Sequence, residues 1–123
     1  MGLLVANIQW VMLAGGLITA SMLLAAAAPR FLFQIMFAET PEGPLGDLLA
    51  RHWGVLIALT AGMLLWGAFH PEVRTLVLVM VSISKLSFVA LTLRVPAYRA
   101  RALVPVVVDL VLVALFVAWL AAA

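Results

Sequence analysis

Two charged residues lie inside long apolar segments of this sequence and could carry chemistry. Lys85 interrupts an apolar run over 75–93, and Asp109 interrupts another over 102–121. A charged side chain inside a membrane costs at least about 2.5–3.5 kcal/mol on insertion scales, so such a residue is a functional candidate by default. A lysine beside a carboxylate can form an ion pair, exchange a proton, or form an imine that has the carboxylate as its counter-ion.

The two residues are expected to lie at similar depth. With a rise of 1.5 Å per residue, Lys85 lies about 13 Å and Asp109 about 10 Å from the helix ends that the segment 94–101 connects. Because this connection is short, we expect antiparallel neighbouring helices and a Lys85–Asp109 ion pair. Ser82 and Thr92 lie on the helix face of Lys85, so the predicted ligand-binding site comprises Lys85, Asp109, Ser82 and Thr92. A pair that only fixes the helix register is the structural alternative.

Other catalytic and metal-binding patterns are missing from the sequence. It contains no cysteine, which excludes thiolate chemistry and cysteine zinc sites. His52 and His70 are separated by about 27 Å along one helix, so they cannot share a metal or a haem within one chain. We therefore predict no metal site and no cofactor, except that a quinone or lipid could bind near the Lys85–Asp109 pair.

The elements that position these residues must be membrane helices. Of the 123 residues, 67% are hydrophobic and 10% are charged, whereas about 25% of the residues of a soluble domain are charged. The net charge is +2 and the basic residues are scattered, so no nucleic-acid partner is expected. The composition predicts one domain over 1–123 whose main partner is the lipid bilayer.

Four runs are long enough to cross a membrane, and each is too long and too uniformly apolar for a β-barrel strand. The expected fold is an all-α bundle of four antiparallel transmembrane helices over about 3–28, 53–70, 75–93 and 102–121. The loop 29–52 begins with an apolar stretch. This stretch is either an interfacial helix or a continuation of the first helix past a kink at Pro29, and 39–44 has the composition of a turn.

The arginines predict how the bundle is oriented. Arg30, Arg51, Arg94, Arg99 and Arg101 lie on one side, and Arg74 alone lies on the other. The positive-inside rule places the arginine-rich side in the cytoplasm and both termini on the non-cytoplasmic side of the cell membrane, the inner membrane in a bacterium. An anion or lipid headgroup could bind at this side, to a cluster of Arg51, His52, Arg94 and Arg99. The alternative is that these charges only set the topology.

Small residues recur on the second predicted helix. Gly54, Ala58 and Gly62 follow one another at four-residue spacing, which lets helix backbones approach closely in lipid. This ladder predicts tight packing within the bundle. A homodimer, or contact with a larger membrane complex, is the alternative.

The layout resembles the DoxX-like superfamily of small four-helix membrane proteins. The resemblance runs through most of the chain. It rests on Pro29 at the end of the first helix, Arg51-x-Trp53-Gly54 at the second, the Pro71-x-x-Arg74 turn, Lys85 in the third helix and Asp109 in the fourth. It implies a four-helix fold, and some proteins of this kind are accessory to quinone-linked oxidoreductases.

Three functions are compatible with these features. The first is an accessory protein, or one that binds a hydrophobic ligand such as a quinone or lipid, built around the Lys85–Asp109 pair. The second is a small membrane enzyme with Lys85 and Asp109 as catalytic residues, either an acid–base isomerase of a lipid-like substrate or an imine-forming lysine. The third is an oligomeric, proton-coupled transporter of a small solute.

Overall fold

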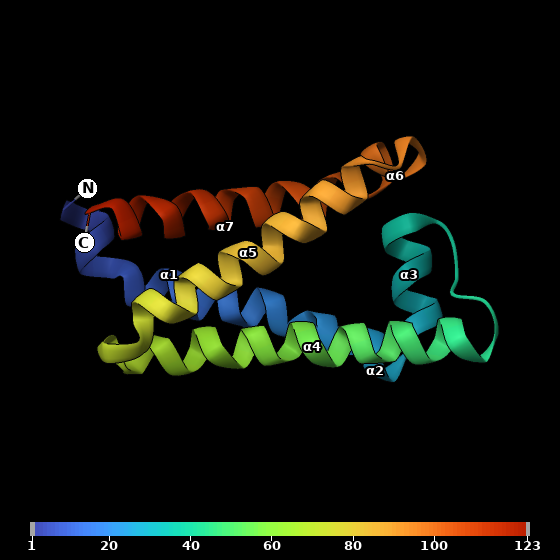
Figure 1. The fold of residues 1–123 in the computed structure, drawn as a ribbon, viewed down its shortest axis with the longest axis horizontal. Coiled ribbons are helices and arrows are strands. Elements are labelled where there is room, and N and C mark those ends of the chain that lie inside the picture. The colour runs from blue at the N-terminus through green and yellow to red at the C-terminus, as the bar shows by residue number, and fades with distance from the viewer. Residues whose placement is uncertain (1, 123) are drawn as a thin grey trace.

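A computed structural model describes residues 2–122, and these residues form helices and short turns without any strand. Four helical segments are long and apolar enough to cross a membrane: Gly2–Ala27, Gly43–Phe69, Pro71–Leu93 and Leu103–Ala122. They run up and down along one long axis, and both ends of the chain lie at the same end of the bundle (Figure 1). The prediction of four long apolar helices is therefore confirmed.

The first segment ends at a sharp change of direction. It consists of α1 (Gly2–Ala20), the 3-10 turn η1 (Ser21–Leu23) and α2 (Leu24–Ala27). Ala28 then leaves the helical conformation, with φ −141° and ψ 69°, because a residue before a proline is disfavoured in the helical region. The next helix, α3 (Pro29–Phe37), crosses the direction of the long helices (Figure 1). Of the two alternatives for this stretch, the structure has the separate helix.

The second long helix begins ten residues earlier than predicted. It is α4 (Gly43–Phe69), whereas the charged residues before Trp53 had suggested a loop that ends at 52. Pro44 lies in its first turn, where a missing N–H does little harm. The Arg51 Nε lies 2.9 Å from the Asp47 carboxylate one turn earlier, a spacing that supports a helix. Only residues 38–42 remain as the connection.

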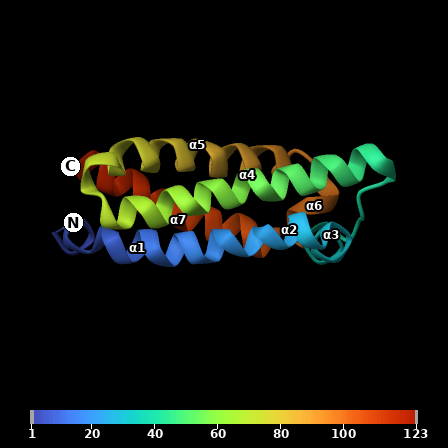
Figure 2. The same cartoon turned by 90° about the horizontal axis from the view of Figure 1, so that it is seen from below.

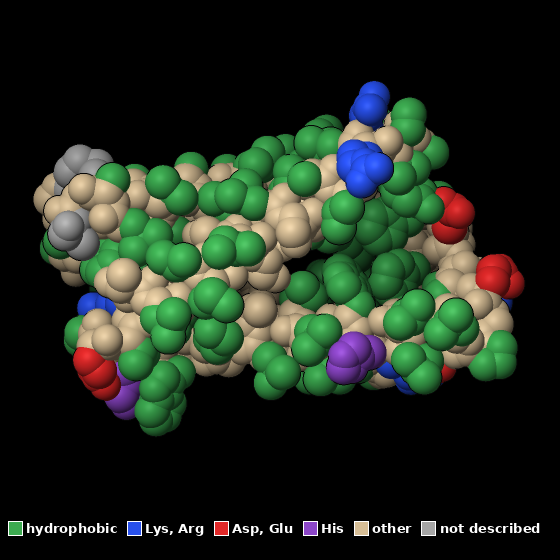
Figure 3. Space-filling model, in the orientation of Figure 1, with side chains coloured by type: hydrophobic (Ala, Val, Ile, Leu, Met, Phe, Trp, Pro, Cys, Tyr) green, Lys and Arg blue, Asp and Glu red, His purple; other side chains and the backbone are tan. Residues whose placement is uncertain are grey.

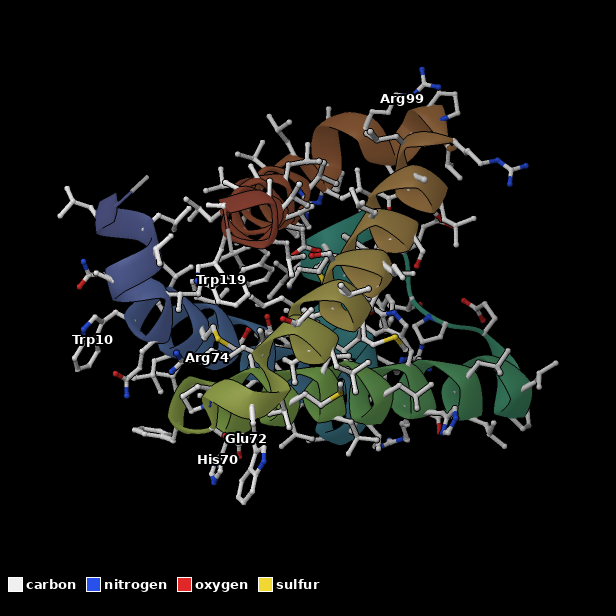
Figure 4. All side chains as sticks on the ribbon, turned by 60° about the vertical axis from the view of Figure 1, so that its left-hand side comes forward. Trp10, His70, Glu72, Arg74, Arg99 and Trp119 are labelled. Carbon is white, nitrogen blue, oxygen red and sulfur yellow. The ribbon has the colours of Figure 1, made fainter. Side chains whose placement is uncertain are left out.

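The bounds of the last two long helices lie within one residue of those predicted from the sequence. The 3-10 turn η2 (Pro71–Val73) leads into α5 (Arg74–Leu93), and the short α6 (Pro96–Arg101) leads into α7 (Leu103–Ala122). Arg74 donates hydrogen bonds to the carbonyls of Gly67 (2.9 Å) and Ala68 (2.7 Å), in the last turn of α4, where carbonyls have no partner in a following turn of the helix. Figure 4 shows Arg74 at this end of the bundle.

The four long helices form two pairs. α1 packs along α4, and α5 packs along α7, with α4 lying between α1 and α5 in Figure 2. Near the chain ends the pairs share one apolar core, in which Ile8, Met12, Leu64, Leu78 and Phe116 are fully buried. Toward α3 and α6 the pairs diverge (Figure 1).

The outer surface of the bundle is apolar. Many large hydrophobic side chains are exposed along all four long helices, among them Leu3, Leu59, Leu76 and Val104. Figure 3 shows hydrophobic side chains over the length of one face, with acidic and basic side chains toward its two ends. An apolar surface of this extent is typical of helices that contact lipid.

The small-residue ladder does not form one packing face. A Cβ added to Gly54 would lie 2.7 Å from the Ala26 nitrogen and 2.8 Å from the Ala25 Cβ, so this glycine lets α4 approach α2. Gly62 is exposed and has nothing within 4 Å of such a Cβ. Because four residues advance a helix by about 40° more than one turn, Gly62 lies about 80° around α4 from Gly54.

Gly54→Ala and Gly62→Ala should change stability in opposite directions. We expect Gly54→Ala to lower the free energy of unfolding by about 1–3 kcal/mol, because its new methyl group overlaps the α2 backbone. Gly62→Ala should raise it by about 0.4–1 kcal/mol, because alanine restricts the unfolded chain and meets no neighbour here. Thermal unfolding in mild detergent, followed by circular dichroism, measures both. Equal effects would contradict the intramolecular role of Gly54.

Candidate functional site

The side chain of Lys85 connects three helices. From α5 its Nζ donates to Oδ1 of Asp109 on α7 at 2.9 Å and to Oγ1 of Thr19 on α1 at 3.0 Å. Only 7% of Lys85 and 4% of Thr19 are exposed. The structure thus brings the two predicted residues, Lys85 and Asp109, into contact and adds Thr19 as a second partner of the amine.

Thr19 is a site residue that the sequence analysis missed. On the first helix it lies four residues after Gly15, which made it resemble one more small packing residue. The depth of Thr19 within its helix could have identified it as a partner of Lys85. Thr19 lies about 14 Å from the predicted end of that helix at residue 28, close to the value for Lys85. A hydroxyl at the depth of a buried amine is a natural hydrogen-bond partner, because buried polar groups need one.

The two other hydroxyls of the predicted site lie apart from the pair. Ser82 is buried, and its Oγ has no hydrogen-bond partner within the described residues. Thr92 is also buried, near the other end of α5. Neither hydroxyl is hydrogen-bonded to Lys85 or Asp109 in the described part of the chain.

A cavity of about 300 Å³, which we call the inner cavity, lies beside the Lys85–Asp109 pair. Both members of the pair line it, as do Thr19, Thr60 and Ser84. The remaining walls are mostly apolar, and they come from α1, α3, α4, α5 and α7. Their main side chains are Ile18, Met22, Leu32, Ile35, Met36, Val104, Pro105 and Val108. The inner cavity is therefore mostly apolar, with a few hydroxyl groups, and Lys85 and Asp109 are the charged residues in its described lining.

A larger cavity of about 680 Å³, the outer cavity, lies between α3, α4 and α5. Residues Trp53, Ile57, Ser84 and Phe88 line both cavities, so the two adjoin. Figure 3 shows this face hollowed between α4 and α5, with hydrophobic side chains along the hollow. Thr92 lines the outer cavity and not the inner one.

Aromatic rings form much of the wall of the outer cavity. Trp53 lies 5.2 Å from Phe33 and 6.2 Å from Phe88, and Phe37 lies 4.9 Å from Tyr98, measured between ring centroids. Such separations are typical of packed aromatic pairs. Because Phe33 and Phe37 belong to α3, the short helix across the bundle closes this cavity on one side.

Glu39 and Tyr98 determine the charge of the outer cavity. Both line it, and Glu39 is the charged residue in that lining. Hydrogen bonding to the Glu39 carboxylate, with smaller contributions from burial and from the charge of Glu39, raises the pKa of the Tyr98 phenol above its usual value. Tyr98 thus stays neutral at physiological pH, beside an exposed glutamate at the edge of the outer cavity.

The four residues of the predicted headgroup cluster come from α4, from the end of α5 and from α6. Arg51 donates from α4 to the Ala26 carbonyl at 2.6 Å and pairs with Asp47, and His52 follows it on α4. Arg99 donates from α6 to the Leu93 carbonyl at 2.7 Å. Arg94 is exposed at the end of α5, and Figure 4 shows Arg99 far from the turn that carries Arg74. None of these four residues lines either described cavity.

Within residues 2–122, no three His, Asp or Glu side chains are grouped so that they could hold a metal ion. No protein-family model, no curated protein and no solved structure matches the chain.

Removing one member of the Lys85–Asp109 pair should cost far more than removing both. We expect Lys85→Met or Asp109→Leu alone to lower the free energy of unfolding by about 3–5 kcal/mol, because each leaves a buried charge without its partner. The double variant should be about as stable as the wild type, since two apolar side chains of similar size replace the pair. Chemical unfolding of the four proteins in mild detergent gives the double-mutant cycle.

Ser82→Ala is the matched control on the same helix. Its hydroxyl is buried without a partner, so its removal should not lower stability. Additive effects of Lys85→Met and Asp109→Leu would show that the two side chains are not coupled.

Proposed function

We propose that this chain is a multi-pass protein of the cell membrane that binds a hydrophobic ligand, a quinone or another lipid, in the inner and outer cavities. In this role it serves as a binding or accessory subunit of a larger membrane enzyme. The observation that carries the proposal is the position of Lys85 and Asp109. Both line a mostly apolar cavity, and a few placed polar groups in an apolar cavity are the usual form of a small-molecule site.

The volumes of the cavities support the same function. The inner and outer cavities measure about 300 and 680 Å³, within the range of about 300–1,000 Å³ that is typical of ligand sites. They adjoin at Trp53, Ile57, Ser84 and Phe88. A ligand with a polar end and a long apolar chain would fit with its polar end in the inner cavity and its chain in the outer one.

The proposed orientation follows from the arginines. The end of the bundle with α3 and α6 carries five of the six arginines, so the positive-inside rule places it in the cytoplasm and both termini outside. The four-helix arrangement is compatible with the DoxX-like resemblance, which would relate the chain to accessory proteins of quinone-linked enzymes. A homodimer would use Ala58 and Gly62, because Gly54 packs against α2 within the chain.

A small membrane enzyme is the second candidate. It is favoured by one observation, that the amine of Lys85 lines an apolar cavity beside a carboxylate. After Asp109 takes a proton from the ammonium group, the free amine could condense with an aldehyde or ketone to form an imine and release one water molecule. Borohydride treatment of the protein from its native membrane, followed by mass spectrometry of the Lys85 peptide, tests this candidate. An unmodified Lys85 would argue against it.

The binding function is tested by the lipids that the protein retains. We expect the wild-type protein, purified in mild detergent, to carry a hydrophobic molecule at close to one per chain, measured by mass spectrometry of an organic extract. Ser84→Phe should lose most of it, because the new ring fills the junction of the two cavities. Ile83→Phe adds the same ring to a neighbouring position that is 59% exposed and should retain the molecule. Equal retention by both variants, or none by the wild type, would contradict the proposal.

A further inference from the structure

The charges along the two cavities restrict what kind of polar end a ligand can have. The inner cavity carries one positive and one negative residue, Lys85 and Asp109, and the outer cavity carries Glu39. No arginine lines either described cavity. A ligand in the inner cavity therefore lies beside a pair whose charges cancel, and meets no arginine in the described lining of either cavity.

An acidic head group does not fit these surroundings. A fatty-acid carboxylate or a phosphate in the inner cavity would lie beside the Asp109 carboxylate, and like charges in a poorly solvated site repel strongly. The Lys85 ammonium group could not compensate, because it already neutralises Asp109 at 2.9 Å. The head group that this site accepts is therefore uncharged.

The hydrogen bonds left open at the pair specify the head group further. An ammonium group has three N–H donors, and Lys85 uses two of them, for Asp109 and Thr19. The Asp109 carboxylate accepts at Oδ1, and its other oxygen has no hydrogen-bond partner within the described residues. The site thus offers one donor and one acceptor side by side. A hydroxyl group can satisfy both, whereas a ketone or an ester can only accept.

We propose that the ligand is a lipid alcohol, whose hydroxyl group accepts a hydrogen bond from Lys85 and donates one to Asp109 while its apolar chain lies in the outer cavity. This inference rests on the proposed function and deepens it. The aromatic wall of Phe33, Phe37, Trp53 and Phe88 would hold the chain. The same chemistry could come from a single-chain alcohol or from a diacylglycerol.

Trp53 provides a direct reporter because it lines both cavities. Bromine atoms on a bound chain quench a neighbouring tryptophan, so four probes with the same brominated chain can be compared: dibromostearyl alcohol, methyl dibromostearate, dibromostearate and dibromooctadecane. They differ only in the head group. Trp53→Phe gives the background from the other three tryptophans, and the difference between the two proteins isolates binding beside Trp53.

We expect the alcohol to bind about tenfold or more tightly than the hydrocarbon, as two hydrogen bonds to a charged pair would produce. The ester should lie between them, and the carboxylate should bind no better than the hydrocarbon. In the Lys85→Met/Asp109→Leu double variant, alcohol and hydrocarbon should bind alike. Tighter binding of the carboxylate, or equal binding of all four probes by the wild type, would overturn the inference and leave the binding function standing.

If no probe quenches Trp53, both the inference and the proposed function fail. Displacement of the bound brominated alcohol separates the two natural sources. Stronger displacement by dioleoylglycerol than by oleyl alcohol supports the inference with a glycerolipid as the ligand, and the reverse supports it with a single-chain alcohol. Displacement by oleate alone would contradict it.

Discussion

The ammonium group of Lys85 bonds to both helix pairs at the point where they diverge. In lipid, helices gain little from burying apolar surface against one another, so close packing and polar contacts between helices decide the arrangement. Near the chain ends, a packed core joins the α1/α4 and α5/α7 pairs. Beyond that core Lys85 bonds to Asp109 in its own pair and to Thr19 in the other. A buried amine requires partners, and the long Lys85 side chain finds one on α1, across the bundle from α5.

The contact between Lys85 and Asp109 could be predicted from the sequence because charged residues are rare in it. In a chain with 10% charged residues, a charge inside a span stands out, and matching depths on adjacent helices sufficed to predict that Lys85 and Asp109 would meet. The same sensitivity to charge misplaced the start of α4. Asp47, Arg51 and His52 suggested a loop, but charged residues can also lie on a part of the helix that extends beyond its apolar span. There Arg51 bonds to Asp47 and to the Ala26 carbonyl. Charge therefore marks the edge of an apolar segment rather than the end of a helix.

Other features depend on which way a side chain faces, and spacing alone does not give that. A four-residue ladder turns by about 40° at each step, so Gly54 packs on α2 while Gly62 faces outward. Spacing likewise does not show that Arg51 bonds to a carbonyl of α2 or that Arg99 bonds to the last carbonyl of α5. The Thr19 contact could have been predicted by comparing the depth of this hydroxyl in the first helix with the depth of Lys85 in the third, as was done for Asp109. For these residues the sequence indicated the kind of contact, but not the direction in which each helix face points.

The role of α3 shows how a turn in the backbone creates the cavities. Pro29 ends the first span at Ala28, and Ala38, in the left-handed conformation with φ 58°, ends α3 nine residues later. The aromatic residues of α3 are thereby turned back toward Trp53 on α4 and Tyr98 on α6. Phe33 and Phe37 thus wall the outer cavity, while Leu32, Ile35 and Met36 of the same helix wall the inner cavity beside the ion pair. A single α-helix continued past Pro29 would carry these rings away from α5 and leave the pair's polar atoms open to lipid chains, which offer no hydrogen bonds.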